Sequence, residues 1–189
     1  MRLFTAIELP PHLLLRLERV LSALRPEAQI NWSPLDNLHL TTSFIGTWPE
    51  ARLDELTNAL SSLLPRESFE VTLKDFCWFP NARSPHVLSI GTDTCEPLQR
   101  LGEDTRNCLE RLGVAREKRP YMPHLTLARI KRPVSLQRLR QKLEIFQPPS
   151  TFGAFEIHSF GLYRSDPGSN ASVYRKLKDF RFEAVVAAS

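Results

Sequence analysis

Apolar and polar positions alternate along the chain with two different periods, which divide it into strands and helices. Residues 2–9 form a short apolar run of strand character, and residues 10–24 open with two prolines and then repeat leucine at helical spacing. The same criteria predict strands at 37–46, 68–79, 86–92 and 123–130, and helices at 49–64, 95–113 and 134–146. Residues 152–165 and 172–182 predict a closing antiparallel pair joined by a turn.

The order of these elements repeats, so that each half of the chain reads strand, helix, strand, helix, strand. The first half covers about residues 1–80 and the second about 85–189, with a proline-bounded segment between them. The halves share little sequence, so we interpret the repeat as architectural. We expect a single α+β domain over residues 1–189.

Composition narrows the class of protein without identifying a function. The chain has 189 residues, of which 42% are hydrophobic, and a formal net charge of +4. That charge is compatible with an anionic partner but does not identify one. The three cysteines are scattered and odd in number, which indicates a reducing compartment. The N-terminus lacks a signal-peptide pattern, and no apolar run approaches the roughly 18 residues that span a bilayer. We therefore expect a cytoplasmic protein with no membrane partner.

One triplet, His-Leu-Thr, occurs at 39–41 and again at 124–126, each time within a predicted strand. Side chains on a strand alternate between faces, so His39 and Thr41 share one face, as do His124 and Thr126. The intervening leucines point to the core. If the two strands lie side by side, two imidazoles and two hydroxyls converge in one cleft.

These four side chains suit the chemistry of a phosphodiester. One imidazole can take a proton from water while the other gives one to the leaving oxygen, since both forms are accessible near neutral pH. The threonine hydroxyls can donate hydrogen bonds to the non-bridging phosphate oxygens. A single His-x-Thr on a strand arises easily by chance, but two copies at equivalent places in two matching halves favour a site. Nothing in the set requires a metal.

The sequence resembles the 2H phosphoesterase family, and within it the branch of RNA 2′,3′-cyclic phosphodiesterases, also called 2′-5′ RNA ligases. The resemblance covers nearly the whole chain and rests on segments that match in order: RLFTAIELP, NLHLTTSFIG, RPYMPHLTLAR and the C-terminal FGLYRS with YRKLKDFRF. One departure is Thr42, where the branch more often has an apolar residue. Because Thr42 follows Thr41, we expect it to face away from the cleft.

The resemblance implies two pseudo-symmetric lobes around a central cleft, each an antiparallel sheet with helices outside. It implies metal-independent opening of a ribose 2′,3′-cyclic phosphate to a 2′-phosphate, with a capacity to join or cleave 2′-5′ RNA linkages and no cofactor. On this basis His39 is assigned as proton donor to the departing 3′ oxygen and His124 as proton acceptor from water, although the two roles could be exchanged. Thr41 and Thr126 are assigned to the substrate phosphate, and the expected partner of this monomer is RNA or a small nucleotide.

Other candidates are weighed less heavily. Arg129 falls on the opposite face by simple alternation, yet it lies at a strand end and remains a candidate substrate contact. The basic run 116–119 precedes the second triplet and could meet an RNA backbone. Three aromatic residues could stack on a base, and three further histidines are expected at the surface or in structural roles. The aromatics are Trp32, Phe44 and Tyr121, and the histidines are His12, His86 and His158.

Two alternative functions stay open. One is a phosphodiesterase for small cyclic nucleotides or 2′-5′ oligoadenylates, which would share the four site residues. The other is a non-catalytic module that binds AMP-like ligands. Intact histidines in both triplets argue against a pure binder, which has no need of two proton-transfer groups.

Overall fold

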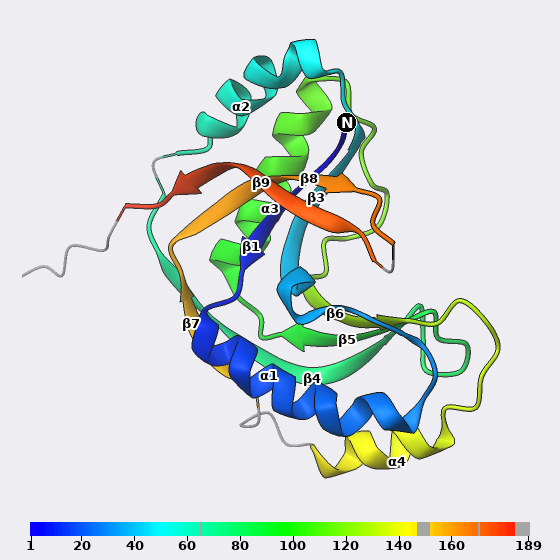
Figure 1. Cartoon of the computed structure of the whole chain (residues 1–189). Coiled ribbons are helices and arrows are strands. Elements are labelled where there is room, and N and C mark those ends of the chain that lie inside the picture. The colour runs from blue at the N-terminus through cyan, green and yellow to red at the C-terminus, as the bar shows by residue number, and fades with distance from the viewer. Residues whose placement is uncertain (65, 147–151, 170, 184–189) are drawn as a thin grey trace, which may run out of the picture.

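The structure is a computed structural model, and it describes residues 1–64, 66–146, 152–169 and 171–183 (Figure 1). The strands within this part of the chain are β1 (Arg2–Glu8), β2 (Asn31–Trp32), β3 (His39–Thr47), β4 (Phe69–Phe79), β5 (Val87–Thr92), β6 (His124–Arg129), β7 (Gly153–Ile157), β8 (Ser159–Asp166) and β9 (Val173–Arg181). The α-helices are α1 (Pro11–Leu24), α2 (Leu53–Ser61), α3 (Glu96–Arg111) and α4 (Gln137–Ile145). Short 3₁₀ turns at Arg25–Glu27, Leu35–Asn37 and Glu50–Arg52 connect them.

The strands form one nine-stranded sheet in the order β7-β4-β5-β6-β3-β1-β8-β9, with β2 paired to β6. Adjacent strands of this path run antiparallel. The two strands that carry His-Leu-Thr, β3 and β6, lie at the centre and meet through the pair Leu40–Leu125. They join a strand group of β1, β3, β8 and β9 to a second group of β4 to β7. The expected α+β architecture with two lobes of antiparallel strands is confirmed.

The helices cover the outer faces of the two strand groups (Figure 1). Helices α1 and α4 lie along the group that contains β4 and β5, whereas α2 and α3 pack beside the group that contains β1 and β3. The two sequence halves therefore interleave: α1 from the first half covers one strand group, and α3 from the second half packs against β3 in the other.

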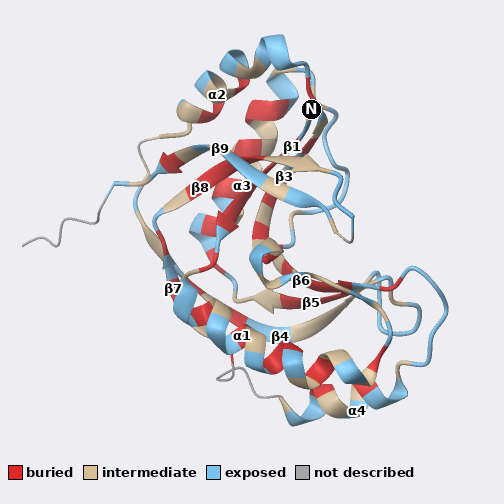
Figure 2. Ribbon diagram, in the orientation of Figure 1, coloured by how far each residue is buried: buried red, intermediate tan, exposed pale blue. Residues whose placement is uncertain are grey.

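Helix α1 shows how the sequence pattern builds this core. Its apolar residues recur every three or four positions, and the buried ones are Leu13, Leu17, Val20, Leu21 and Leu24. Pro11 occupies the first turn, where its missing N–H costs nothing and its fixed φ suits a helix. Figure 2 shows buried and exposed residues alternating along the helices, as expected where one face of a helix packs on the sheet. Each fully buried leucine contributes roughly 1.5–3 kcal/mol of transfer free energy.

The prediction of one strand at 152–165 is wrong, because two strands occupy this range. Strand β7 pairs with β4 in one group, and β8 pairs with β1 in the other. Phe155 and Ile157 are buried before the break, and Phe160 and Leu162 after it. The buried face thus changes from odd to even positions across His158, which is where the chain passes between the groups. The predicted pairing of the last two strands, β8 with β9, is confirmed.

The remaining predicted elements are present with slightly different bounds. The predicted helix at 49–64 begins as a 3₁₀ turn and becomes α2, and the helix predicted at 134–146 is α4. In the described part of the chain, no helix is both long and apolar enough to cross a membrane.

Candidate active site

The central strands β3 and β6 bring the four side chains of the two triplets to one face. Leu40 and Leu125 are paired in antiparallel register and fully buried. Their neighbours point the other way, so this register sets His39 beside Thr126 and Thr41 beside His124. The four are half-buried, partly open to solvent. The site is pseudo-symmetric, with each histidine facing the threonine of the opposite strand.

Both imidazoles are oriented by the same backbone contact. The Nδ1 atom of His39 lies 2.8 Å from the carbonyl oxygen of Asn37, and that of His124 lies 2.8 Å from the carbonyl oxygen of Met122. A carbonyl can only accept, so Nδ1 carries the hydrogen in each ring and Nε2 is left for substrate. In His39, Nε2 also lies 3.0 Å from Thr41 Oγ1. The neutral ring accepts the threonine proton there.

Aromatic rings that the sequence reasoning missed hold the histidines in place. The ring of Phe4 lies 5.0 Å from that of His39, and Tyr174 approaches His39 edge-on at 5.3 Å. On the other strand group, Phe79 lies 4.8 Å from His124. These residues come from β1, β9 and β4, far from the triplets in sequence. No local pattern singles them out, because only the strand pairing brings them to the site.

The pKa of His39 is lowered from 6.5 to about 4, mainly because burial removes the water that would solvate a charged ring. The positive charge of Arg129, and that of His124 in its protonated form, act in the same direction, while the hydrogen bond to the Asn37 carbonyl opposes the shift. In the free protein His39 is therefore neutral at pH 7.

This pKa predicts an acid-sensitive contribution to stability. As the pH falls from 6.5 toward about 4, the unfolded chain gains a proton at His39 that the folded protein excludes, so the free energy of unfolding decreases. The contribution should approach about 3 kcal/mol at the low end of the window. Urea denaturation of the wild type and of His39→Gln across this range measures it. His12→Gln, exposed on α1, is the control. Identical pH slopes for wild type and His39→Gln would contradict the shift.

Arg129 lies on the same face as the triplets, so the expectation from simple alternation is wrong. In the β5–β6 pairing, Ser89 opposes Thr126 but Leu88 opposes Ala128, so β6 carries one extra residue. This bulge reverses the alternation, and Arg129 pairs with Val87 on the side of the site. The guanidinium is exposed and close enough for its charge to lower the pKa of His39.

The other sequence candidates divide into structural and exposed residues. Tyr121 donates its hydroxyl hydrogen to the carbonyl oxygen of Thr41 at 3.1 Å, and Trp32 Nε1 donates to the carbonyl oxygen of Ala28 at 3.1 Å. Both rings are thereby fixed in the fold, whereas Phe44 is 69% exposed. His12, His86 and His158 are exposed, as expected for surface histidines.

Thr42 faces away from the site, as the sequence predicts. It is 1% exposed and donates its hydroxyl hydrogen to Thr5 Oγ1 at 2.7 Å, behind the sheet. In the basic run 116–119, Arg116 is held by Glu103 and Glu110, and Arg119 lies 3.4 Å from Glu117. Lys118 is exposed, so contact of this loop with RNA stays a prediction.

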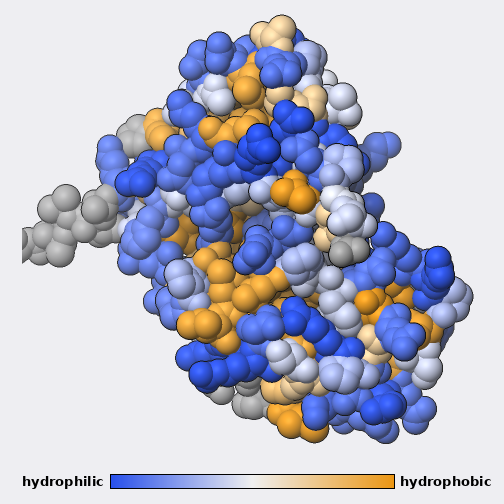
Figure 3. All heavy atoms as spheres, in the orientation of Figure 1, coloured by the Kyte–Doolittle hydropathy of each residue, from blue (hydrophilic) through white to orange (hydrophobic). Residues whose placement is uncertain are grey.

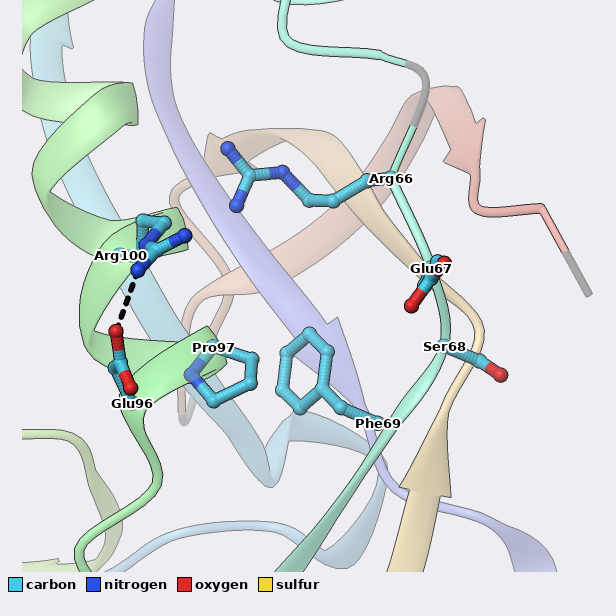
Figure 4. Close-up of a pocket in the computed structure, with 7 residues that line it drawn as sticks. All are labelled: Arg66, Glu67, Ser68, Phe69, Glu96, Pro97 and Arg100. Atoms are coloured by element: carbon cyan, nitrogen blue, oxygen red, sulfur yellow. Dashed lines mark hydrogen bonds and ion pairs between the residues drawn. The ribbon is translucent and has the colours of Figure 1, made fainter. Parts of the chain in front are cut away.

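The cavities in the described part of the surface include a larger one away from the triplets and a smaller one that adjoins His39. That cavity, of about 120 Å³, is lined by Phe4, Glu8, Asp36, Leu38, His39, Tyr163, Tyr174 and Lys176. The other, of about 280 Å³, lies at the start of β4 beside the N-terminus of α3 (Figure 4). Its two arginines already pair with carboxylates, Arg66 with Asp104 and Arg100 with Glu96. The cavity beside His39 adjoins the triplets, whereas the lining of the other contains none of the four triplet residues.

Within the described residues, no three His, Cys, Asp or Glu side chains are grouped as a metal site would require. The face shown in Figure 3 is largely hydrophilic, with apolar residues in separate patches.

The antiparallel sheet, with one His-x-Thr strand from each strand group at its centre, defines a fold of the 2H phosphoesterase class. The chain belongs to the 2′-5′ RNA ligase superfamily, whose model matches residues 9–169. It is 29% identical over 180 residues to an RNA 2′,3′-cyclic phosphodiesterase of Methanocaldococcus jannaschii, covering 95% of this chain and 100% of that protein. A Thermus thermophilus protein of the same description is 31% identical, covering 95% and 89%. The crystal structure of E. coli LigT complexed with 3′-AMP has a TM-score of 0.80 at 26% identity, covering 96% of this chain and 97% of that one.

Proposed function

We propose that this protein is a metal-independent RNA 2′,3′-cyclic phosphodiesterase that opens a terminal cyclic phosphate to a 2′-phosphomonoester. The observation that carries the proposal is the pairing of β3 and β6, which sets each imidazole beside the threonine of the other strand. The names of the M. jannaschii and T. thermophilus relatives, aligned over most of both chains, support the substrate class.

In the proposed reaction the two Nε2 atoms act on opposite sides of the phosphorus. His124 accepts a proton from water as the water oxygen attacks, and His39 donates a proton to the departing 3′ oxygen. Thr41 and Thr126 donate hydrogen bonds to the non-bridging oxygens, where negative charge accumulates. When the 5′-hydroxyl of a second RNA takes the place of water, its oxygen attacks the phosphorus and gives its proton to His124, while the 3′ oxygen leaves with a proton from His39. This transesterification is the reverse of the cleavage of a 2′-5′ linkage. A 2′-5′ linkage then forms without a nucleoside triphosphate.

The low pKa of His39 places a condition on this assignment. A general acid must carry its proton, yet His39 is neutral in the free protein at pH 7. A bound phosphate brings negative charge next to the ring, and an adjacent opposite charge raises the pKa of an imidazole. Substrate binding is therefore the step that protonates His39, and the acid forms where the leaving oxygen needs it.

Two further assignments concern the cellular location and the oligomeric state of the protein. The three cysteines are free thiols, which fits the cytoplasm as the expected location. The protein is expected to act as a monomer, because all four assigned site residues come from one chain.

We expect turnover to survive chelation, because proton transfer by two imidazoles and stabilisation by two hydroxyls need no Lewis acid. The measurement is incubation with an oligonucleotide ending in a 2′,3′-cyclic phosphate, with and without EDTA. The expected product carries a 2′-phosphate. Loss of activity in EDTA that a divalent ion restores would exclude the metal-free mechanism. A 3′-phosphate product would show that the 2′ oxygen leaves instead of the 3′ oxygen.

A small nucleotide is the second candidate substrate, favoured by the 120 Å³ cavity beside His39 with its aromatic and charged lining. The same assay with a mononucleoside 2′,3′-cyclic phosphate separates the two. A higher kcat/KM on the oligonucleotide supports RNA ends, whereas equal values support the small nucleotide. Tight binding of AMP without turnover of either substrate would instead support the alternative of a non-catalytic module that binds AMP-like ligands.

A further inference from the structure

The junction between β3 and β6 is narrow for the task it has. In the described part of the chain it consists of one residue pair, Leu40–Leu125, whereas every other junction along the strand path is paired over at least five residues. A single pair supplies few backbone hydrogen bonds to resist sliding or tilting of the two strand groups. Yet this junction is the one that aligns the two triplets.

Two side-chain hydroxyls cross the junction, on opposite sides of the Leu40–Leu125 pair. Tyr121, in the segment before β6, donates to the carbonyl oxygen of Thr41 on β3 at 3.1 Å. Ser33, in the segment before β3, donates to the carbonyl oxygen of Thr126 on β6 at 2.9 Å. The backbone of each triplet threonine is thus bound by a hydroxyl from the segment that leads into the opposite strand. We call the side chains of Tyr121 and Ser33 the hydroxyl bridges.

The ring of Tyr121 is fixed by helix α3. A Cβ atom at Gly102 would overlap this ring, so glycine leaves the space that the ring occupies. The guanidinium of Arg106 lies 5.3 Å from the ring centroid and donates to the carbonyl oxygen of Arg119 at 3.0 Å. Helix α3 therefore holds both the ring and the segment before it, and the hydroxyl reaches Thr41 from a fixed position.

Ser33 is fixed by the backbone of β6. Its N–H donates to the carbonyl oxygen of Leu127 at 2.8 Å, and the preceding Trp32 pairs with Ala128. Ser33 thus continues the pairing of β2 with β6, and its side chain adds one hydrogen bond inside the second triplet. The two bridges come from different segments and reach the same kind of acceptor.

The register of β3 against β6 bears directly on the proposed reaction. The carbonyl oxygen of Thr41 accepts from Tyr121, while its Oγ1 lies 3.0 Å from Nε2 of His39. A shift of β3 along β6 would therefore move the first triplet relative to the second. Misplacing a reacting group by about 1 Å can cost about 10²-fold in rate.

We propose that Tyr121 and Ser33 are positioning residues, which hold the two triplets in register by bridging β3 and β6 with their hydroxyls. The proposal rests on the proposed function, in which both triplets act on one phosphate. Because the bridges act through the backbone of the two strands, their loss should disturb the alignment of acid and base more than the binding of substrate. The effect is therefore expected in kcat and not in KM.

The test removes one hydroxyl at a time. Tyr121→Phe and Ser33→Ala should each lower kcat on the cyclic-phosphate oligonucleotide roughly 3- to 30-fold and leave KM within about 2-fold. Ser33→Thr keeps a hydroxyl and should recover most of the rate. The double variant should lose more than the product of the two single effects, because either bridge alone still limits movement at the junction.

Two matched controls remove a hydroxyl bond elsewhere. Thr42→Val loses the buried bond to Thr5, which joins β3 to β1 within one strand group. Ser61→Ala loses a half-buried serine hydroxyl that donates to the carbonyl oxygen of Thr57 on α2 at 2.8 Å. Both should keep kcat. Wild-type kcat in both bridge variants, or the same loss of kcat in a control with the same melting temperature, would overturn the positioning role.

Amide hydrogen exchange measures the junction without reference to catalysis. In Tyr121→Phe and Ser33→Ala, exchange at residues 39–41 and 124–126 should quicken roughly 5- to 10-fold relative to the β1–β8 pairing, as expected for loss of one hydrogen bond. If the wild type opens cyclic phosphates and the bridge variants match it in kcat and exchange, the bridges alone are wrong. If the wild type is inactive, the proposed function is wrong. Faster exchange would then still support the bridging of β3 and β6, and unchanged exchange would overturn it too.

Discussion

Replacing His39 or His124 with alanine is expected to lower kcat by roughly 10²- to 10⁴-fold, the usual contribution of one general acid or base. In the proposed reaction the two Nε2 atoms act on opposite sides of one phosphate, so each variant would lose either protonation of the leaving oxygen or deprotonation of water. Steady-state kinetics on the cyclic-phosphate oligonucleotide measures the loss. The double variant should fall short of the product of the two single effects, because groups that act as a unit are not additive.

The pH–rate profile of each variant then assigns the roles. If His39 is the acid, His39→Ala loses the alkaline limb of the kcat profile, where the wild type fails for lack of a proton. If His124 is the base, His124→Ala loses the acidic limb. The opposite pattern would exchange the roles. His12→Ala, at an exposed position on α1, should keep the full rate and both limbs. A folded His39→Ala or His124→Ala with near-normal turnover would remove that histidine from the mechanism.

Replacing Thr41 or Thr126 with valine is expected to lower kcat by roughly one to three decades while leaving the fold intact. Valine keeps the shape of threonine but removes the hydroxyl that is proposed to face a phosphate oxygen. Both side chains are half-buried at an open face, so their loss creates no buried cavity, and the melting temperature should stay within a few degrees. Thr41→Ser and Thr126→Ser retain the hydroxyl and should recover most of the rate.

Thr42→Val is the matched control, since it changes the same residue type one position along and on the other face. Its hydroxyl is buried against Thr5, and removing one partner of a buried hydrogen bond costs roughly 1–3 kcal/mol. Thr42→Val should therefore melt earlier and keep its kcat. If Thr41→Val kept its activity and melted sharply earlier instead, Thr41 would be structural and the symmetric interpretation of the triplets would fail.

Alternation along strands was sufficient to predict the faces of His39, Thr41, His124 and Thr126, because no bulge interrupts the three residues of either triplet. The same rule failed three residues after the second triplet. Arg129 returns to the site through a bulge, and a bulge depends on the partner strand rather than on the bulged sequence. The local sequence pattern therefore places the residues of the two triplets correctly and misplaces Arg129, which follows a bulge.

Long-range pairing explains the other differences between sequence and structure. Phe4, Tyr174 and Phe79 reach the histidines from strands that only the folded sheet places there. Tyr121 looked like a stacking residue, yet its hydroxyl bonds to the Thr41 backbone, and burial raises the pKa of its phenol. The break at His158 shows in the structure as a shift of the buried apolar side chains from odd to even positions. The sequence alone does not reveal it, because strand-forming residues continue on both sides of His158.

The position of β1 between β3 and β8 has a consequence for synthesis of the chain. Arg2 pairs with Ser165 and Ala6 with Gly161, so β1 finds one of its two neighbours only after β8 has been translated. Until then one edge of β1 lacks a partner, and Ile7 and Phe4 have only part of their packing. The nascent chain therefore carries an open, apolar strand edge until β8 is made, a state in which closure of so long a loop is slow and association with other chains competes.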